Sequence, residues 1–153
     1  QRASTVGEFG WKFDGCPPVG GGLAYDLNNP NQLHSLGWTG AEQKAGLYYL
    51  MSQDNGKSWS IPKKMGKSAI HSDIAVYDGK LVALWDEMEA DGTSIFYSKS
   101  EDSGNSWSPP TRLSDAKNAA THPRLVATTH GFLASWTEKP SKQASQLALS
   151  LIE

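Results

Sequence analysis

The sequence predicts an all-β protein built from a repeated unit, and three observations support this prediction. The 153 residues include 15 Gly, 8 Pro and 6 Trp, a composition typical of turns and half-buried strands. No stretch of useful length has the apolar periodicity of a helix. The tryptophans recur at intervals of 47 to 51 residues in two series, which are Trp11, Trp59 and Trp107, and Trp38, Trp85 and Trp136.

Each unit contains four short strands in about 48 residues, which is typical of a β-propeller blade. The second strand of each unit ends at a tryptophan, and Asp78-Gly79 and His130-Gly131 supply hairpin turns before it. The fourth strand follows the next tryptophan. The first three strands are expected at 23–25, 34–37 and 46–50, at 75–77, 81–84 and 94–97, and at 126–128, 132–135 and 146–149.

A motif of the form Ser-x-Asp-x-Gly-x-Ser-Trp occurs twice, at the same phase of the repeat. Its defining residues are Ser52, Asp54, Gly56 and Trp59 in the first copy, and Ser100, Asp102, Gly104 and Trp107 in the second. These segments resemble Asp-boxes, the bacterial neuraminidase (BNR) repeats of sialidase-like β-propellers. The resemblance implies a propeller whose boxes lie on the face away from the active site.

The two aspartates of the motif are interpreted as structural rather than catalytic. Gly56 and Gly104 allow the positive φ of a tight turn. Asp54 and Asp102 can accept hydrogen bonds from the turn amides, and the tryptophans can anchor the turn on the blade through their large apolar area.

The chain is predicted to be one propeller module of three blades. The tryptophan phase divides it into blades at about 11–58, 59–106 and 107–153, with residues 1–14 supplying a closing strand. Closed rings need about four to eight blades, so three cannot close alone. Two hypotheses remain open. In the first, which we favour, two chains form a six-bladed ring as a homodimer, and each chain donates its first strand to the other. In the second, the chain is part of a longer propeller whose other half is missing.

A ligand site is expected where the first strands begin, near the propeller axis. His71 and His122 occupy equivalent positions there, and Arg124 is placed to clamp an anion. They form a metal or polar-ligand site, or else each histidine stabilises its own blade connection. We do not predict a metal, because no carboxylate or thiol spacing supports one independently. The carboxylates expected on this face are Asp73, Glu87 and Glu138, with Asp86 and Glu89 beside them.

Two other features of this face have structural interpretations. The glycine-rich stretch at 15–22 lacks the Lys-Ser/Thr of a phosphate-binding loop, and Cys16 in it is expected to be a small buried hydrophobe. Trp38, Trp85 and Trp136 could stack on sugar rings, but their repetition favours packing between blades.

The chain has no complete sialidase site. That family uses a tyrosine nucleophile assisted by a glutamate and an arginine triad, whereas this chain has three arginines, of which Arg124 is near the predicted axis. We therefore predict a non-catalytic, sialidase-like module that binds a ligand such as a glycan, or a self-assembling scaffold. The alternative is part of a sialidase-like glycoside hydrolase whose triad and nucleophile lie outside this chain.

Net charge, apolar runs and cysteine content limit the kinds of partner and covalent link that the chain can have. A net charge of −2 argues against binding to nucleic acid or an anionic membrane, and no apolar run is long enough for a transmembrane helix. One cysteine permits no intrachain disulfide. No cofactor is predicted. A chain that begins with Gln1 rather than Met is expected to be a processed chain or a fragment, and a secreted or periplasmic location is expected.

Overall fold

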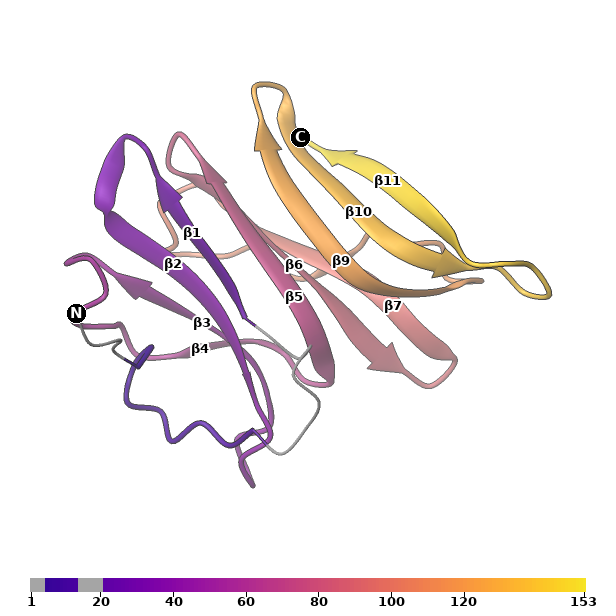
Figure 1. Ribbon diagram of the computed structural model, residues 1–153, viewed down its shortest axis with the longest axis horizontal. Helices are drawn as coiled ribbons and strands as arrows, with labels where there is room; N and C mark the ends of the chain where they lie inside the picture. The colour runs from indigo at the N-terminus through magenta and orange to yellow at the C-terminus, as the bar shows by residue number, and fades with distance from the viewer. Residues whose placement is uncertain (1–4, 14–20) are drawn as a thin grey trace.

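The computed structural model describes residues 5–13 and 21–153, which form eleven strands in three antiparallel sheets (Figure 1). None of these residues belongs to a helix, so the described chain has no helix able to cross a membrane. The first sheet contains β1 (Gly22–Asp26), β2 (Asn29–Thr39), β3 (Gly46–Ser52) and β4 (Lys63–Gly66). The second contains β5 (Ala69–Tyr77), β6 (Lys80–Glu89), β7 (Gly92–Ser100) and β8 (Thr111–Arg112). The third contains β9 (Ala119–Thr128), β10 (Gly131–Lys139) and β11 (Gln146–Ile152).

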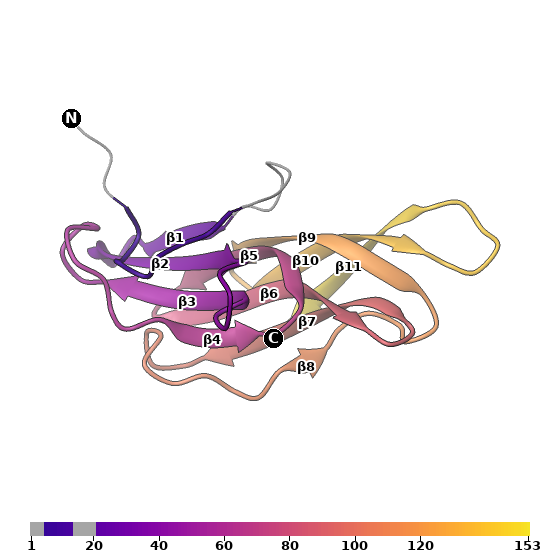
Figure 2. The same cartoon turned by 90° about the horizontal axis from the view of Figure 1, so that it is seen from below.

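The sheets pack against one another like the blades of a propeller. In each sheet the strands follow chain order, and the first strands β1, β5 and β9 are neighbours. Figure 2 shows these first strands along one side of the molecule, with β4 and β8 on the opposite side. The all-β, bladed fold predicted from the sequence is confirmed.

Two apolar cores lie between the blades. Leu36, Leu47 and Trp85 belong to the core between the first and second sheets, and Phe132 and Trp136 belong to the core between the second and third. Trp85 is 1% exposed and Trp136 is 5% exposed, so these repeated tryptophans pack between blades instead of forming a surface for stacking on sugars.

The sheet boundaries differ from the divisions drawn at the tryptophans. β4 pairs with β3, and β8 pairs with β7, so the first two sheets end at Gly66 and Arg112 and not at residues 58 and 106. The reason is that each motif tryptophan precedes the last strand of its own blade. A division at Trp59 or Trp107 therefore assigns that strand to the following unit.

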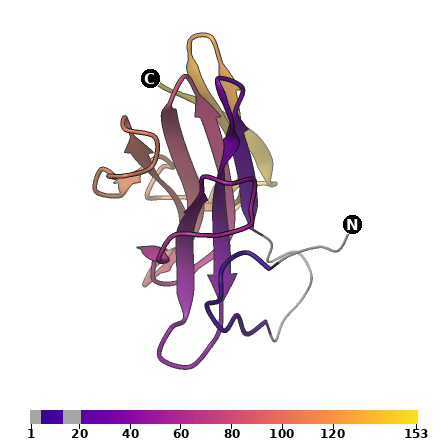
Figure 3. The same ribbon diagram turned by 90° about the vertical axis from the view of Figure 1, so that its left-hand side faces the viewer.

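The N-terminal segment, residues 5–13, lies against the first sheet. The Phe9 ring is 4.6 Å from the Tyr48 ring, and the Gly40 amide donates to the Lys12 carbonyl at 2.9 Å. Figure 3 shows this segment beside the first blade. Within one chain, the described part of the predicted closing strand therefore adds no strand to the third sheet; residues 1–4 and 14 lie outside the described residues.

Candidate functional site

The first strands of the second and third blades each carry a β-bulge at their beginning. In β5, Ile70 and His71 together lie opposite Asp86; in β9, His122 and Pro123 together lie opposite Trp136. A bulge leaves backbone amides without a partner in the strand ladder. His122 has a φ of 56°, which is unusual for a residue with a side chain. The two bulges place both histidines at the same end of adjacent strands.

The carboxylate of Asp86 accepts hydrogen bonds from the amides that these bulges release. Oδ1 accepts the Ile70 amide at 3.2 Å and the His71 amide at 2.9 Å. Oδ2 accepts the His122 amide at 3.2 Å and the Thr121 hydroxyl at 2.8 Å. The Asp86 side chain is 2% exposed. One buried carboxylate on β6 therefore joins β5 of its own blade to β9 of the next.

Asp86 also orients both imidazoles. His71 Nδ1 lies 2.6 Å from Asp86 Oδ2, and His122 Nδ1 lies 3.1 Å from the Thr121 hydroxyl oxygen. Because the Thr121 hydroxyl donates to Asp86, it accepts from His122, so the network assigns a hydrogen to Nδ1 of both rings. Each Nε2 then carries the lone pair. The two rings are stacked, with centroids 3.9 Å apart.

The charge on Asp86 is maintained by these contacts. Burial raises its pKa, but hydrogen bonds from the His71 amide, the His71 ring and the Thr121 hydroxyl outweigh burial and lower the pKa below its usual value. The carboxylate is therefore ionised at neutral pH and holds the hydrogen-bond network in one arrangement.

The other predicted carboxylates have structural contacts. Asp73 accepts the Leu125 amide of β9 at 2.9 Å, a second link between the two blades. Glu87 accepts the amides of Lys67 and Ser68 at 3.0 and 2.6 Å. It also accepts the indole N–H of Trp85 at 2.9 Å, so it fixes the connection before β5.

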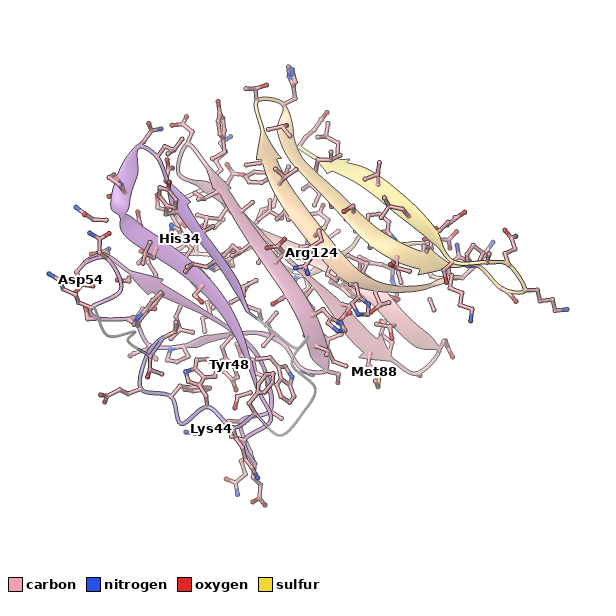
Figure 4. All side chains as sticks on the ribbon, viewed as in Figure 1. His34, Lys44, Tyr48, Asp54, Met88 and Arg124 are labelled. Carbon is pink, nitrogen blue, oxygen red and sulfur yellow. The ribbon has the colours of Figure 1, made fainter. Side chains whose placement is uncertain are left out.

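Glu138 and Arg124 are not brought into the histidine cluster by any contact. Glu138 lies 3.4 Å from the Gln146 amide nitrogen. Arg124 lies in the middle of β9 (Figure 4) and lines a hollow of about 130 Å³ with Val126, Leu133 and Leu149 on the outer face of the third sheet. Arg124 therefore borders a partly apolar hollow of this sheet.

Asp86 and Thr121 are the residues of the histidine cluster that the repeat pattern does not single out. The residue after the repeated tryptophan is Thr39 in the first blade and Thr137 in the third, so an aspartate at this position of the second blade is a departure from the repeat. Thr39 binds the N-terminal segment, since its hydroxyl accepts the Lys12 amide at 3.1 Å. An aspartate at a repeat position that otherwise holds threonine is the feature of the sequence that distinguishes Asp86.

The described residues contain no group of three or more His, Cys, Asp or Glu side chains placed to hold a metal ion. Cys16 and most of the glycine-rich stretch lie outside the described residues. The predicted buried position of Cys16 stays a prediction.

The two Ser-x-Asp-x-Gly-x-Ser-Trp motifs fold into matching turns. Ser52 donates to Asp54 at 2.8 Å, and Asp54 accepts the amide of Ser58 at 2.8 Å and its hydroxyl at 2.7 Å. The second copy repeats these bonds through Ser100, Asp102 and Ser106. Hydrogen bonds, first of all from the Ser58 and Ser106 hydroxyls, lower the pKa of each aspartate to about 2. Such a carboxylate is a poor proton donor.

These turns lie away from the histidine cluster. The Asn55 amide donates to the Asn31 carbonyl, and the Ser103 amide donates to the Gly79 carbonyl, so each turn sits beside a hairpin between the first two strands of a blade. Figure 4 places Asp54 at one end of the blades and Met88, which follows Asp86 on β6, at the other. The turns and the cluster therefore occupy opposite ends.

Comparisons with known proteins bear on the fold. No family model matches the sequence, and no curated protein matches it either. Among solved structures, the α-L-arabinofuranosidase Arb93A from Fusarium graminearum, in complex with an iminosugar inhibitor, has a TM-score of 0.61 at 12% identity. The Bacteroides ovatus xyloglucan PUL GH43B has a TM-score of 0.54 at 13% identity. The likeness shows the fold.

The two alignments cover most of this chain but a minor part of the similar structures. They include 86% and 83% of this chain, against 44% and 25% of the two longer proteins. The chain thus spans less than half the length of either one.

Proposed function

We propose that this chain is a carbohydrate-binding β-propeller module whose ligand binds where β5 and β9 begin. The proposal rests on the buried Asp86, whose carboxylate accepts hydrogen bonds from both bulged strands. The same network orients His71 and His122 so that Nε2 is the acceptor atom of each ring. Preorganised acceptors on rigid strands suit a ligand rich in hydroxyl donors, because little entropy is lost when it binds.

Binding is favoured over catalysis by the contacts of the carboxylates. Glycoside hydrolysis generally needs two carboxyl groups flanking the sugar. Asp86, Asp73 and Glu87 each accept backbone amides from neighbouring strands or connections. Their acceptor atoms are used to hold the blades together, which leaves the imidazoles as the polar groups offered to a ligand.

The class of ligand is supported by the similar structures, which are a furanosidase bound to an iminosugar and a protein named for xyloglucan. The Asp-box resemblance adds a sialidase-like module as the finer form of the proposal. The second candidate, part of a glycoside hydrolase whose catalytic groups lie outside this chain, is favoured by the same two structures. A secreted or periplasmic location fits both candidates.

Calorimetric titration with arabino-oligosaccharides, xyloglucan oligosaccharides and sialyllactose tests the proposal. We expect one of these probes to bind, and the His71→Ala and His122→Ala variants to lose at least about tenfold in affinity, or about 1.4 kcal/mol. Met88→Ala, an exposed change near the same end, should bind as the parent does. Equal affinity in all variants would exclude the site, and cleavage of a probe would favour the hydrolase.

A further inference from the structure

The third sheet has an uncovered apolar outer face. Its exposed side chains lie in cross-strand register, with Val126 opposite Leu133 and Leu133 opposite Leu151. Leu147 and Leu149 continue the row on β11 and are 73% and 62% exposed. The opposite face packs on the second blade. A continuous apolar row of this kind on a water-soluble sheet is typical of an interface.

The third sheet also has an open edge. β4 pairs with β3, and β8 pairs with β7, but no described strand pairs with the free edge of β11. An open edge next to an apolar face offers both backbone hydrogen bonds and apolar surface to an added strand.

The N-terminal segment, residues 5–13, has the position in the 48-residue repeat that would place it next to β11 as a fourth strand. Trp59 and Trp107 each precede the strand that completes a sheet, and Trp11 precedes Trp59 by the same 48 residues. In the structure, the Trp11 segment lies on the outer face of the first sheet. Phe9 contacts Tyr48, the Trp11 ring meets Gly37, and Gly7 lies close to Leu50.

This segment is placed on the first blade, on the far side of the second blade from the third (Figure 1). It therefore does not reach the β11 edge of its own chain. The outer face that it partly covers also leaves Leu23 and Tyr25 exposed, at 65% and 53%. Each end of the three-blade stack thus presents an apolar face, and the segment that extends the repeat lies on one of them.

We infer that the outer face of the third sheet and the β11 edge bind a second copy of this chain, which supplies residues 5–13 and the outer face of its first sheet. The contact joins the last blade of one copy to the first blade of the next, as β9 already joins β5 within the chain. Two such contacts close a ring of six blades, which leaves no sheet end exposed. The inference is independent of the ligand proposed above.

Light scattering across a size-exclusion peak of the full chain tests this inference. We expect a mass twice the 16.6 kDa of the chain, and Leu149→Glu should return the mass to that of one chain. Ile61→Glu, a matched change at a side chain that is 90% exposed before β4, should leave the dimer unchanged. Far-UV circular dichroism of both variants establishes that they fold. A monomeric parent chain would overturn the inference.

Contacts between the two copies test which segment lies on the outer face of the third sheet and the β11 edge. In a mixed dimer of isotope-labelled and unlabelled chains, we expect intermolecular NOEs from the Leu149 and Leu151 methyl groups to the rings of Phe9 and Trp11. A dimer whose Leu149 methyl groups contact residues outside segment 5–13 and the first sheet would overturn the assignment of the occupant.

Discussion

Asp86 shows how one side chain determines the arrangement of two blades. It is buried beside two bulges, and it accepts three backbone amides, one hydroxyl and one imidazole N–H. Unpaired buried amides are costly, so a residue that satisfies three of them at once stabilises the junction and the imidazole orientation together. Structure and site therefore depend on the same carboxylate.

Replacing Asp86 by Asn should destabilise the fold. The amide group keeps one acceptor oxygen and adds an N–H₂ group that faces other donors, so we expect a loss of about 2–4 kcal/mol in the free energy of unfolding. Urea denaturation measures this loss. Asp91→Asn makes the same chemical change at an exposed loop position and should alter stability by less than about 0.5 kcal/mol. Equal stability of the two variants would contradict the role of Asp86.

His34 makes stability depend on pH. Its Nδ1 lies 2.8 Å from the Tyr49 hydroxyl, and burial lowers its pKa from 6.5 to about 4, although Asp26 acts in the opposite direction. The folded state disfavours the proton, so this contribution is complete above pH 6.5 and is lost as the pH falls toward 4. We expect the free energy of unfolding to fall by up to about 1.4 kcal/mol per pH unit in that window.

Urea denaturation at a series of pH values, in the parent and in His34→Gln, isolates this effect. The variant should show a flatter pH dependence between 6.5 and 4 because it has no titrating group at this position. Parallel curves for the two proteins would assign the pH dependence to other residues.

At the scale of elements, the motif turn of one blade also packs against the preceding blade. The Trp107 ring meets the Tyr49 ring at 4.8 Å, and a Cβ on Gly104 would overlap the Tyr49 hydroxyl. Gly56 in the first motif has a similar positive φ, but a Cβ there would meet Leu33 at 3.4 Å. The two glycines thus share a backbone requirement and differ in their contact with a neighbouring blade.

Gly104→Ala should therefore destabilise the protein more than Gly56→Ala. Both substitutions strain the left-handed backbone by about 1–2 kcal/mol, and we expect a further cost of about 1–3 kcal/mol at Gly104 from overpacking. Combining Gly104→Ala with Tyr49→Phe should recover part of that further cost, measured as a coupling energy in a double-mutant cycle. Equal losses at the two glycines would contradict this contact between blades.

The strands could be predicted from the sequence, whereas the contacts between them could not. Tryptophans and motif serines repeat at a fixed interval, so the strands and the bladed fold could be predicted from them. Asp86 could not be placed, because its partners lie on β5 and β9 and its role depends on bulges that leave no periodic pattern. Arg124 follows His122 by two residues on β9 and lines a hollow with Val126 and Leu133; its predicted role in binding a ligand stays a prediction.

At the scale of the whole molecule, three blades share two cores and leave an apolar face at each end. The histidine cluster lies at one end of the inner strands, and the motif turns lie at the other. Residues at both ends hold neighbouring blades together, through Asp86 at one end and through the contact of Trp107 with Tyr49 at the other. The proposed ligand site requires that Asp86 hold His71 and His122 with their Nε2 atoms free to accept hydrogen bonds.

Long-range ¹H–¹⁵N correlation spectra of the histidine side chains test this claim most directly. At neutral pH we expect both rings to carry hydrogen on Nδ1, and both Nε2 signals to move when the oligosaccharide that binds in calorimetry is added. Spectra of His71→Ala and His122→Ala assign the two signals. Hydrogen on Nε2 in either ring, or Nε2 signals that stay unchanged at saturating oligosaccharide, would contradict the account.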